Sequence, residues 1–464
     1  MRKGMASQPY CSAHFLALAR NTVAFSFLFP SFTSILPIRI VKLTNQKGNE
    51  HRLPFFPCCE EEIGSDADTA MSEQRETFSR SPDVLIIGGG VIGCSIAYHL
   101  TRRGCRNVVV IEKNTIGTGS TAKAAGGIRQ QFSCESNVRM AMYSVDFFEH
   151  FHERLELPPD AGGVDFHQVG YLFLLSTKEA FTTFKQAATF QQGLGLPVEV
   201  LTAEQVGTRW PWLSVNDVAG ATYCPTDGYG SPHEVTQAFA AQARRLGASF
   251  VEGAAVSAIT RKGARIVTVE TNRGSFSPGI VVICAGAWSG ELGRLAGVEI
   301  PVHPLRRMCF TTDPFDAIPH DAPMTIEMPN TFHFRPEGSG FMLGASDQHE
   351  PYSFNTTVNW EWLNTVVEDA VKRVPLLEQA RIHHGWAGLY EMSPDHNAIL
   401  GPISGMENLL VATGFSGHGF MQSPATGMII SEFILDGQAH TIDVSDLGIE
   451  RFSTGRFNSE KHVI

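Results

Sequence analysis

A short apolar run that ends in a cluster of glycines restricts how this chain can fold more than any other feature of its sequence. The run Val84–Ile87 has no polar residue, which is typical of a parallel strand buried on both faces. Gly88 permits a tight turn, Gly90 allows the backbone to approach a pyrophosphate, and Gly93 allows the next helix to pack closely on the strand. A helix that begins near Val91 would direct unpaired N–H groups and a positive dipole end toward phosphates. The pattern predicts a dinucleotide site at Gly88, Gly90, Val91, Ile92 and Gly93.

A second apolar run supports the same interpretation. Residues 108–111 read Val-Val-Val-Ile and are expected to form the next parallel strand, with Glu112 at its end. An acidic residue about twenty positions after the glycines can accept hydrogen bonds from ribose hydroxyls, and the adjacent Lys113 is predicted to belong to the same site. Strand, glycines, helix, strand and terminal acid together favour the dinucleotide site. The alternative is a glycine turn in an unrelated α/β unit.

The composition is that of an ordinary globular protein and argues against several classes of function. The 464 residues are enough for two or three domains with a sizeable core. A formal charge of −11, with no sustained basic run, argues against a nucleic-acid partner. The nine cysteines are scattered and include no Cys-x-x-Cys pair, which suits a reducing compartment and predicts neither a disulfide framework nor a zinc site. We therefore expect no metal site.

The first eighty residues differ in composition from the rest. No acidic residue precedes Glu50, while basic residues and serines are frequent, which resembles an organelle transit segment. The alternative is that Met71 is the true start. The uncharged stretch Asn21–Ile38 is barely long enough to span a bilayer and carries two prolines, so no stable membrane span is expected. We exclude residues 1–80 from the fold as a poorly ordered extension or presequence and expect a cytoplasmic protein, with a mitochondrial location as the alternative.

Helix and strand signals alternate after residue 80, with no internal repeat. Ser231 followed by Pro232 is a helix start, because serine caps the helix and proline suits its first turn. The small residues Ala285 and Gly286, followed by Trp288, stand after an apolar run and allow a ligand to lie close to the backbone. Strands are expected at 169–175, 249–253, 264–271, 279–284, 306–312, 331–335, 341–345 and 408–412, and helices at 135–153, 178–194, 203–210, 231–246 and from about 420 to 435.

The spacing of these elements predicts an α/β chain (α+β overall) with two intertwined domains. Strand signals between about 302 and 346 recur at short intervals, which is typical of an antiparallel sheet. Because a buried strand and a glycine-rich turn return near 408, the antiparallel sheet is expected to be inserted into the dinucleotide domain, with the chemistry in the cleft between them. The predicted segments are 81–168, 230–300 and 395–440 for the dinucleotide domain, 169–229 and 301–394 for the substrate domain, and 441–464 for a C-terminal tail.

Five motifs, in order and spacing, carry a family resemblance: Ile86–Gly93, Gly126–Phe132, Ala285–Trp288, Tyr390–Asp395 and Gly414–Phe420. From about Asp83 onward the chain resembles the D-amino-acid-oxidase-like flavoproteins. Within them it is most similar to the branch of sarcosine oxidase β subunits, sarcosine and dimethylglycine dehydrogenases, and dye-linked proline dehydrogenase β subunits. The resemblance implies a glutathione-reductase-like Rossmann domain that binds FAD, and oxidation of a secondary or primary amino acid at a carbon–nitrogen bond.

The same resemblance implies three substrate-binding or catalytic residues. Arg129 falls in a loop that the family places beside the flavin ring, where a guanidinium holds the substrate carboxylate. A planar fork of donors matches a carboxylate in a bidentate way, and the alternative is an arginine in a surface ion pair. His333 and Tyr390 fall where the family places polar or aromatic groups over the substrate. A histidine on a sheet is often only a structural residue.

The resemblance also extends the cofactor site. Gly414–Gly419 precedes a helix, so its N–H groups can face the N1/C2 carbonyl edge of the flavin, where negative charge grows on reduction; the His418 side chain contributes to this or simply packs. Ser120 and Thr121 are expected at the pyrophosphate or the isoalloxazine, although short hydroxyl residues also serve turns. Val256 matches a position that the family uses to bond the adenine through its backbone. The remaining expected contacts are Lys113, Ala285, Gly286, Trp288, Gly417, His418, Gly419 and Met421.

Departures from the family pattern bear on the flavin chemistry. Some sarcosine oxidases tether the flavin through a cysteine whose counterpart is Gly388, which indicates that FAD is bound without a covalent link. Lysines of those oxidases, one of them thought to promote the reaction with oxygen, correspond to Met342 and Met421. Loss of a cation near the flavin removes a stabiliser of developing superoxide charge. This favours a dehydrogenase that passes electrons to a carrier or to an α-type partner subunit.

The predicted function is an FAD-dependent dehydrogenase of a sarcosine-, dimethylglycine- or proline-like substrate. Arg129 would hold the carboxylate while a hydride passes from the α- or N-methyl carbon to flavin N5, and the resulting imine would hydrolyse in water. No dedicated base is required if the amine binds unprotonated. One alternative is an oxidase on the same scaffold that releases hydrogen peroxide. The other is a flavoprotein with a role in assembling a respiratory complex.

Overall fold

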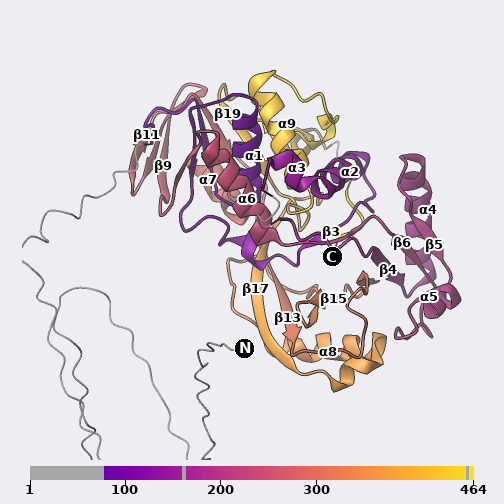
Figure 1. Cartoon of the computed structure of the whole chain (residues 1–464). Coiled ribbons are helices and arrows are strands. Elements are labelled where there is room, and N and C mark those ends of the chain that lie inside the picture. Colours follow the sequence, from indigo (N-terminus) through magenta and orange to yellow (C-terminus); the bar gives the residue numbers. More distant parts are fainter. Residues whose placement is uncertain (1–77, 159–162, 456–458, 464) are drawn as a thin grey trace, which may run out of the picture. The chain divides into compact units, whose positions relative to one another are not determined.

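The glycine turn joins the first strand and the first helix of a six-stranded sheet. Strand β1 (Val84–Ile87) leads into helix α1 (Val91–Arg102), and β2 (Val108–Ile111) follows. In this sheet β1 pairs in parallel with β2 on one side and with β12 (Ile280–Ile283) on the other. The predicted strand–turn–helix–strand unit is therefore present. The structure is a computed structural model that describes residues 78–158, 163–455 and 459–463 (Figure 1).

The other strands of this sheet come from distant parts of the chain, in the order β18-β19-β12-β1-β2-β8. Neighbouring strands are parallel except at the edge, where β18 pairs with β19 in antiparallel fashion. A sheet assembled from three separated segments agrees with the predicted discontinuous Rossmann domain. The remaining bounds are β8 Ser249–Val251, β18 Ile399–Pro402 and β19 Leu409–Thr413.

The side chains of the central strand point alternately into two cores, as the pleat of a strand requires. Val84 and Ile86 pack with helices α1, α2, α6 and α9, and Figure 1 shows α1 beside α6. Leu85 and Ile87 pack instead with helix α7 and a three-stranded sheet, β11-β10-β9. The bounds are α2 Glu135–Glu149, α6 Pro232–Arg245, α7 Ser289–Leu295, α9 Ser423–Leu435, β9 Val256–Lys262, β10 Arg265–Thr271 and β11 Gly274–Phe276.

The inserted sheet has eight strands in the order β17-β13-β16-β15-β14-β4-β6-β5. All neighbouring pairs are antiparallel except β4 with β14. The prediction of an inserted, largely antiparallel sheet is confirmed. The bounds are β4 Tyr171–Leu175, β5 Glu199–Leu201, β6 Gly220–Cys224, β13 His303–Thr312, β14 Met324–Met328, β15 His333–Glu337, β16 Gly340–Gly344 and β17 Ile382–Met392.

One face of the inserted sheet is covered by helices α5 and α8, and α4 covers part of the other face. At the end of α8 the fully buried Arg373 lies 2.8 Å from Glu327 of β14, an ion pair that fixes the helix on the sheet. The bounds are α4 Lys178–Gly193, α5 Ala203–Arg209 and α8 Trp362–Arg373. The shorter pieces are β3 Gly127–Ile128, β7 Gly228–Tyr229 and the 3-10 turns η2 Ser120–Lys123, η3 Gly286–Trp288 and η4 Pro375–Gln379.

The helix predicted at 135–153 is interrupted. It divides into α2 and α3 (Phe151–Leu155) because His150 leaves the helical region, with φ −107° and ψ 25°. The break turns Phe151 into the aromatic cluster formed with Phe147 and Phe239. Apolar periodicity continues through the break, so the sequence pattern alone does not reveal it.

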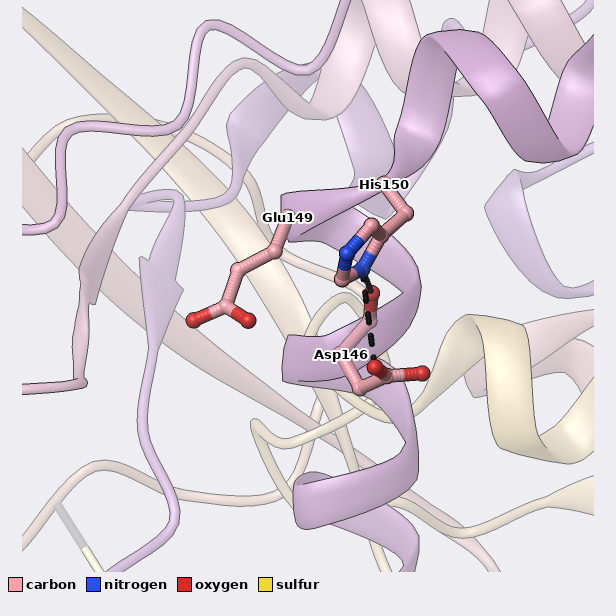
Figure 2. A group of neighbouring side chains, drawn as sticks. All are labelled: Asp146, Glu149 and His150. Carbon is pink, nitrogen blue, oxygen red and sulfur yellow. Dashed lines mark hydrogen bonds and ion pairs between the residues drawn. The ribbon is translucent and has the colours of Figure 1, made fainter.

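The end of α2 carries an exposed group of possible metal ligands, Asp146, Glu149 and His150 (Figure 2). Their ligand atoms lie within 4.8 Å of one another. Asp146 is already paired with Arg154 and with His150, and Glu149 accepts a hydrogen bond from Gln168 at 2.6 Å. Because protein partners occupy these carboxylates, the group carries no argument for a bound ion.

The described residues begin inside the segment that the sequence analysis excludes. Phe78 stacks on Phe276 of β11 with ring centroids 5.9 Å apart, and the Arg80 guanidinium lies over both rings. Residues 78–80 thus belong to the fold, which corrects that boundary. The rest of the predicted extension lies outside the described residues. Among the described residues, no helix is both long and apolar enough to cross a membrane.

The C-terminal segment returns to the fold. It contains the 3-10 turn η5 (Ser445–Leu447) and helix α10 (Arg451–Thr454). Arg451 forms a buried ion pair with Asp395, with 2.8 Å between Nε and Oδ2. Residues 459–463 then lie against the loop that contains Arg129.

Candidate active site

A cavity of about 380 Å³ lies where the two sheets meet. One wall is made by the carboxyl ends of β1, β2 and β12 and by the turns that follow them; the other is made by residues of β13, β15 and β17. In open α/β sheets, ligands bind in the crevice outside the carboxyl ends of the parallel strands. The cavity therefore joins a dinucleotide site to the inserted sheet, as expected of a site for both cofactor and substrate.

The glycine turn closes one end of the cavity at the start of α1. Gly88 has φ +120°, and a Cβ there would lie 2.4 Å from the carbonyl oxygen of Cys284, so only glycine fits. At Gly93, which lies outside the cavity lining, a Cβ would lie 1.9 Å from the carbonyl oxygen of Gly88. Gly90 provides no side-chain cap for α1, which leaves the helix start open to an anion.

Glu112 holds the glycine turn in shape. Its Oε2 accepts a hydrogen bond from Gly89 N at 2.8 Å, and its Oε1 accepts one from Asn114 N at 2.9 Å. Thr121 supports the same turn, because its Oγ1 accepts from Val91 N at 3.1 Å. Both side chains also line the cavity. The predicted contact of Glu112 with ribose hydroxyls stays a prediction, and the structure adds its role in fixing the turn.

Most of the predicted site residues line this cavity. Lys113 and Trp288 stand together there, with Nζ 3.2 Å from the centroid of the indole ring, and burial lowers the pKa of Lys113. The predicted residues that line the cavity are Gly88, Gly90, Val91, Ile92, Glu112, Lys113, Ser120, Thr121, Val256, Ala285, Gly286, Trp288, His333, Tyr390, Gly417 and Gly419. Those absent from the lining are Gly93, Arg129, His418 and Met421.

His333 presents a hydrogen-bond acceptor to the cavity. Its Nδ1 lies 3.1 Å from the carbonyl oxygen of Thr331, which can only accept, so Nδ1 carries the proton and Nε2 has a free lone pair. Burial lowers the pKa of His333 to about 4 and keeps the ring neutral. A Cβ on Gly344, its partner in β16, would lie 2.5 Å from this Nε2. Glycine therefore makes room for the imidazole.

Tyr390 lies on β17 beside residues Gly414–Gly419, which we call the flavin-edge turn because they are predicted to face the N1/C2 edge of the flavin. A Cβ on Gly417 would lie 2.4 Å from its ring, and Gly417 has φ +97°, so the turn and the ring require glycine between them. Burial raises the pKa of Tyr390, which keeps its hydroxyl protonated near neutral pH. The neutral phenol can donate or accept a hydrogen bond.

Arg129 lies away from the cavity and is fully buried. Its guanidinium donates to the carbonyl oxygens of Gln131 at 2.6 Å and His462 at 2.5 Å, and its Cζ lies 4.0 Å from the centroid of the Phe132 ring. It also donates to Nε2 of His418 at 3.1 Å, which requires a neutral imidazole. The His418 side chain is thus directed to Arg129, while the backbone of the flanking glycines lines the cavity.

Sequence reasoning missed five charged or hydroxyl-bearing residues of the lining: Lys123, Glu291, Arg307, Ser346 and Glu391. Glu391 accepts from Thr413 Oγ1 at 2.7 Å and from Gly414 N at 3.2 Å, so it fixes the flavin-edge turn, and burial raises its pKa to about 7. Glu391 belongs to the Tyr-Glu-Met-Ser-Pro-Asp motif, and this position in a family motif could have indicated that it lies at the site. Arg307 is one of two adjacent arginines, and only strand register decides which of them faces the cavity.

The family profile of the DAO family, described as FAD dependent oxidoreductase, matches residues 83–433. The chain belongs to this family. The predicted cofactor, FAD, and the predicted enzyme class, an FAD-dependent oxidoreductase, are thereby confirmed, as is the predicted fold class.

The alignments with similar proteins extend over most of this chain. The FAD-dependent oxidoreductase domain-containing protein 1 of Xenopus laevis is 32% identical, covering 82% of this chain and 85% of that protein. The mitochondrial dimethylglycine dehydrogenase of Homo sapiens is 29% identical, covering 85% of this chain but only 46% of that longer protein. Among solved structures, L-proline dehydrogenase from P. horikoshii superposes with a TM-score of 0.75 at 34% identity, covering 82% of this chain and 99% of that one.

The residues of the cavity fit FAD. Helix α1 starts without a side-chain cap, so its first N–H groups suit a pyrophosphate. The turn before it is formed by glycines, one of which, Gly88, could not carry a Cβ without striking backbone. The Gly417–Gly419 turn offers backbone N–H groups at the other end. Gly388 bears on the mode of attachment, because a Cβ there would lie 2.5 Å from Cβ of Lys123. A cysteine at this position would not fit without movement, and non-covalent binding stays our prediction.

The C-terminal segment 459–463 is held by buried charges. The Glu460 carboxylate accepts hydrogen bonds from Ser133 N at 2.9 Å and from Asn137 Nδ2 at 2.9 Å. Burial opposes its ionisation, but the nearby charges of His462 and Arg129 lower its pKa overall. The His462 ring stacks on Phe184 with centroids 4.0 Å apart, and burial lowers the pKa of His462 to about 4.

We expect acid to weaken this segment's attachment. His462 has a folded-state pKa below its unfolded value near 6.5, so the unfolded chain binds more protons and stability falls as pH drops from 6.5 toward 4. Glu460, with a lowered pKa, contributes stability that is lost at still lower pH, so both signs agree. Urea midpoints at pH 7.5 and pH 5 should show a smaller pH dependence in His462→Gln than in the parent protein. His349→Gln, at a side chain that is 97% exposed, is the matched control and should leave the dependence unchanged.

Proposed function

We propose that this FAD-dependent oxidoreductase oxidises the carbon–nitrogen bond of a small secondary or primary amino acid of the sarcosine, dimethylglycine or proline type. One observation carries the proposal: the glycine turns for FAD share a single cavity with a neutral imidazole acceptor, a phenol and a guanidinium, namely His333, Tyr390 and Arg307. These groups match an amine and a carboxylate. Relatives named dimethylglycine dehydrogenase and L-proline dehydrogenase support this substrate class.

Bound FAD supplies the chemistry by accepting a hydride from the carbon next to nitrogen. A primary or secondary amine also loses its N–H proton, which passes to water, and gives an imine; a tertiary amine of the dimethylglycine type has no N–H and gives an iminium ion. Water hydrolyses either product to a carbonyl compound and an amine. In a primary or secondary amine, His333 accepts the N–H at Nε2 and so orients the nitrogen. Its lowered pKa makes it a poor base near neutral pH, which suits an amine that arrives without its extra proton. When Arg307 pairs with the substrate carboxylate, that negative charge no longer stabilises a protonated amine, which favours the same neutral amine.

The electron acceptor is the second part of the proposal. Met342 and Met421, which replace lysines of related oxidases, predict a site short of cations, but Arg307 in the cavity lining adds a positive charge. A substrate carboxylate would neutralise the guanidinium, however, so the liganded site still lacks a free buried cation to stabilise superoxide. We therefore keep a dehydrogenase that passes electrons to a carrier or partner subunit as the first hypothesis, and a peroxide-forming oxidase as the second.

The test uses the full chain purified with its FAD. N-methyl and cyclic amino acids are added without oxygen, and the visible absorption of the flavin is followed. We expect one group of these compounds to bleach the flavin. If none of the panel does so, amino-acid oxidation is contradicted and a structural role is favoured. Stoichiometric hydrogen peroxide in air would contradict the dehydrogenase and support the oxidase.

A further inference from the structure

Resting on the proposed function, we infer that Arg307 is the residue that binds the substrate carboxylate. The family resemblance assigns this contact to Arg129, but the two guanidinium groups have very different surroundings. Arg307 lines the cavity, whereas Arg129 is sealed inside the protein. The contrast can be followed through the partners of each group.

Arg307 is half-buried and has no acidic partner. Its Nε is sealed from water without a hydrogen-bond partner, as are those of Arg129 and Arg306, and its Nη1 donates only to the carbonyl oxygen of its neighbour Arg306 at 3.2 Å. Among the described residues, no carboxylate lies within 4.0 Å of Arg307. A sealed donor on a guanidinium without a counter-charge is costly, and a ligand carboxylate that binds to its fork of donors would remove that cost.

Other arginines of the same sheet are neutralised by protein carboxylates. Arg306 on β13 lies 2.8 Å from Glu350, and Arg335 on β15 lies 2.6 Å from Glu337. Strand alternation explains the first case, because consecutive residues point to opposite faces and Arg306 lies outside the cavity lining. The free guanidinium of Arg307 is therefore a property of its own position rather than of the whole sheet.

The strand register gives Arg307 room for a ligand. It is paired with Gly388 of β17, so no side chain stands directly opposite it. On the other side, Cys309 of β13 is paired with Gly344 of β16, which in turn is paired with His333. Because neither glycine has a side chain, Lys123 can lie over Gly388 and the His333 imidazole over Gly344, and both Arg307 and His333 line the same cavity. A small α-amino acid can then place its carboxylate at Arg307 and its amine at Nε2 of His333.

Arg129 is unsuited to the same task. Its hydrogen bonds go to the carbonyl oxygens of Gln131 and His462 and to the His418 ring, and Phe132 covers its face. A substrate carboxylate would have to displace the segment 459–463 to reach it. Its structural role is to hold this segment against the flavin-edge turn.

Lys123 is the other cation near the substrate end of the cavity, and its Cβ lies 2.5 Å from the position of a Cβ on Gly388. Its side chain is exposed, so water screens its charge and competes for its donors. A lysine also offers a point charge in place of a planar fork. We assign it at most a secondary role in attracting anionic ligands.

The experiment compares a carboxylate with its neutral counterpart in the FAD-loaded full chain. Cyclopentanecarboxylate and cyclopentanecarboxamide have the same ring, and neither can be oxidised at a carbon–nitrogen bond in the proposed reaction. Binding is followed through the change in the visible flavin spectrum. We expect the acid to bind at least tenfold more tightly than the amide. Arg307→Gln should abolish this preference, and Arg307→Lys should retain part of it.

Two further variants make the assignment specific. Lys123→Gln should weaken the binding of cyclopentanecarboxylate by no more than about threefold, because an exposed charge is screened by water. Arg129→Lys should lose part of its FAD, but its FAD-loaded fraction should keep the preference for the acid. An unchanged preference in Arg307→Gln, its loss in FAD-loaded Arg129→Lys, or no preference in the parent protein would each overturn the proposal. If Arg307→Gln does not retain FAD, Arg307→Lys decides: a preference for the acid smaller than that of the parent protein supports the assignment, and an unchanged preference overturns it.

These titrations need no turnover, which separates the two proposals. Bleaching by amino acids together with an Arg307-independent acid preference would contradict only the carboxylate assignment. An Arg307-dependent preference without bleaching by any amino acid would contradict only the proposed function.

Discussion

Replacing Gly93 with alanine should leave the purified protein almost free of FAD. A Cβ at this position would lie 1.9 Å from the carbonyl oxygen of Gly88 and 3.1 Å from Sγ of Cys284. The first contact involves backbone on both sides, so the start of α1 must move away from β1. That movement displaces the N–H groups that would bind the pyrophosphate. Overpacking of this kind costs about 1–3 kcal/mol of stability, and we expect FAD affinity to fall at least tenfold.

The measurement is the FAD-to-protein ratio after purification, followed by titration of the apoprotein with FAD. Gly193→Ala is the matched control: this glycine ends helix α4 outside the cavity lining, and no atom lies within 4 Å of the Cβ that would be added. It should bind FAD as the parent protein does. Normal FAD content in Gly93→Ala would show that the close approach of α1 to β1 is not required.

Arg373→Met should destabilise the protein by about 3–5 kcal/mol, the usual cost of breaking a buried ion pair on one side. Arg373 is fully buried, and its partner Glu327 is only 2% exposed. Methionine replaces the volume of the side chain but leaves the carboxylate without its counter-charge. Asp217, the second acidic partner at 2.9 Å, is more exposed and can turn toward water.

The double variant Arg373→Met/Glu327→Leu tests this reason directly. Removing both charges leaves no buried carboxylate unpaired, so at least half of the lost stability should return. The free energy of unfolding from urea titrations of the FAD-loaded proteins is the measurement. A loss below about 1 kcal/mol in Arg373→Met, or no recovery in the double variant, would contradict the assignment of this pair as the contact that fixes α8.

Local sequence signals predicted those parts of the fold that depend on neighbours in the chain. The apolar run before Gly88 specified the central strand, and Ser231 caps α6 as expected, accepting from Glu234 N at 3.3 Å. The break at His150 escaped prediction because apolar periodicity continues on both sides of it. What stops the helix is the packing of Phe151, a tertiary contact.

The residues that line the cavity were easier to predict at the glycine turns than on the inserted sheet. The glycine turns have fixed geometry, and their positions follow from the motif. The surroundings of Arg129 depend on His462, which lies 333 positions further along the chain. Arg306 and Arg307 are chemically identical, and only the pairing of β13 with its neighbours decides which one reaches the cavity. No local pattern carries that information.

The hydrogen bond from Arg129 to the carbonyl oxygen of His462 affects when the FAD site can form during synthesis of the protein. Translation runs from the amino to the carboxyl end, so both sheets are synthesised before residues 459–463 leave the ribosome. Until then Arg129 lacks its hydrogen bond to His462, and the flavin-edge turn, which Arg129 contacts through His418, is not held in its final position. Completion of the flavin pocket therefore waits for this segment, and a chain truncated before residue 459 should bind FAD poorly, as the FAD-to-protein ratio after purification would show.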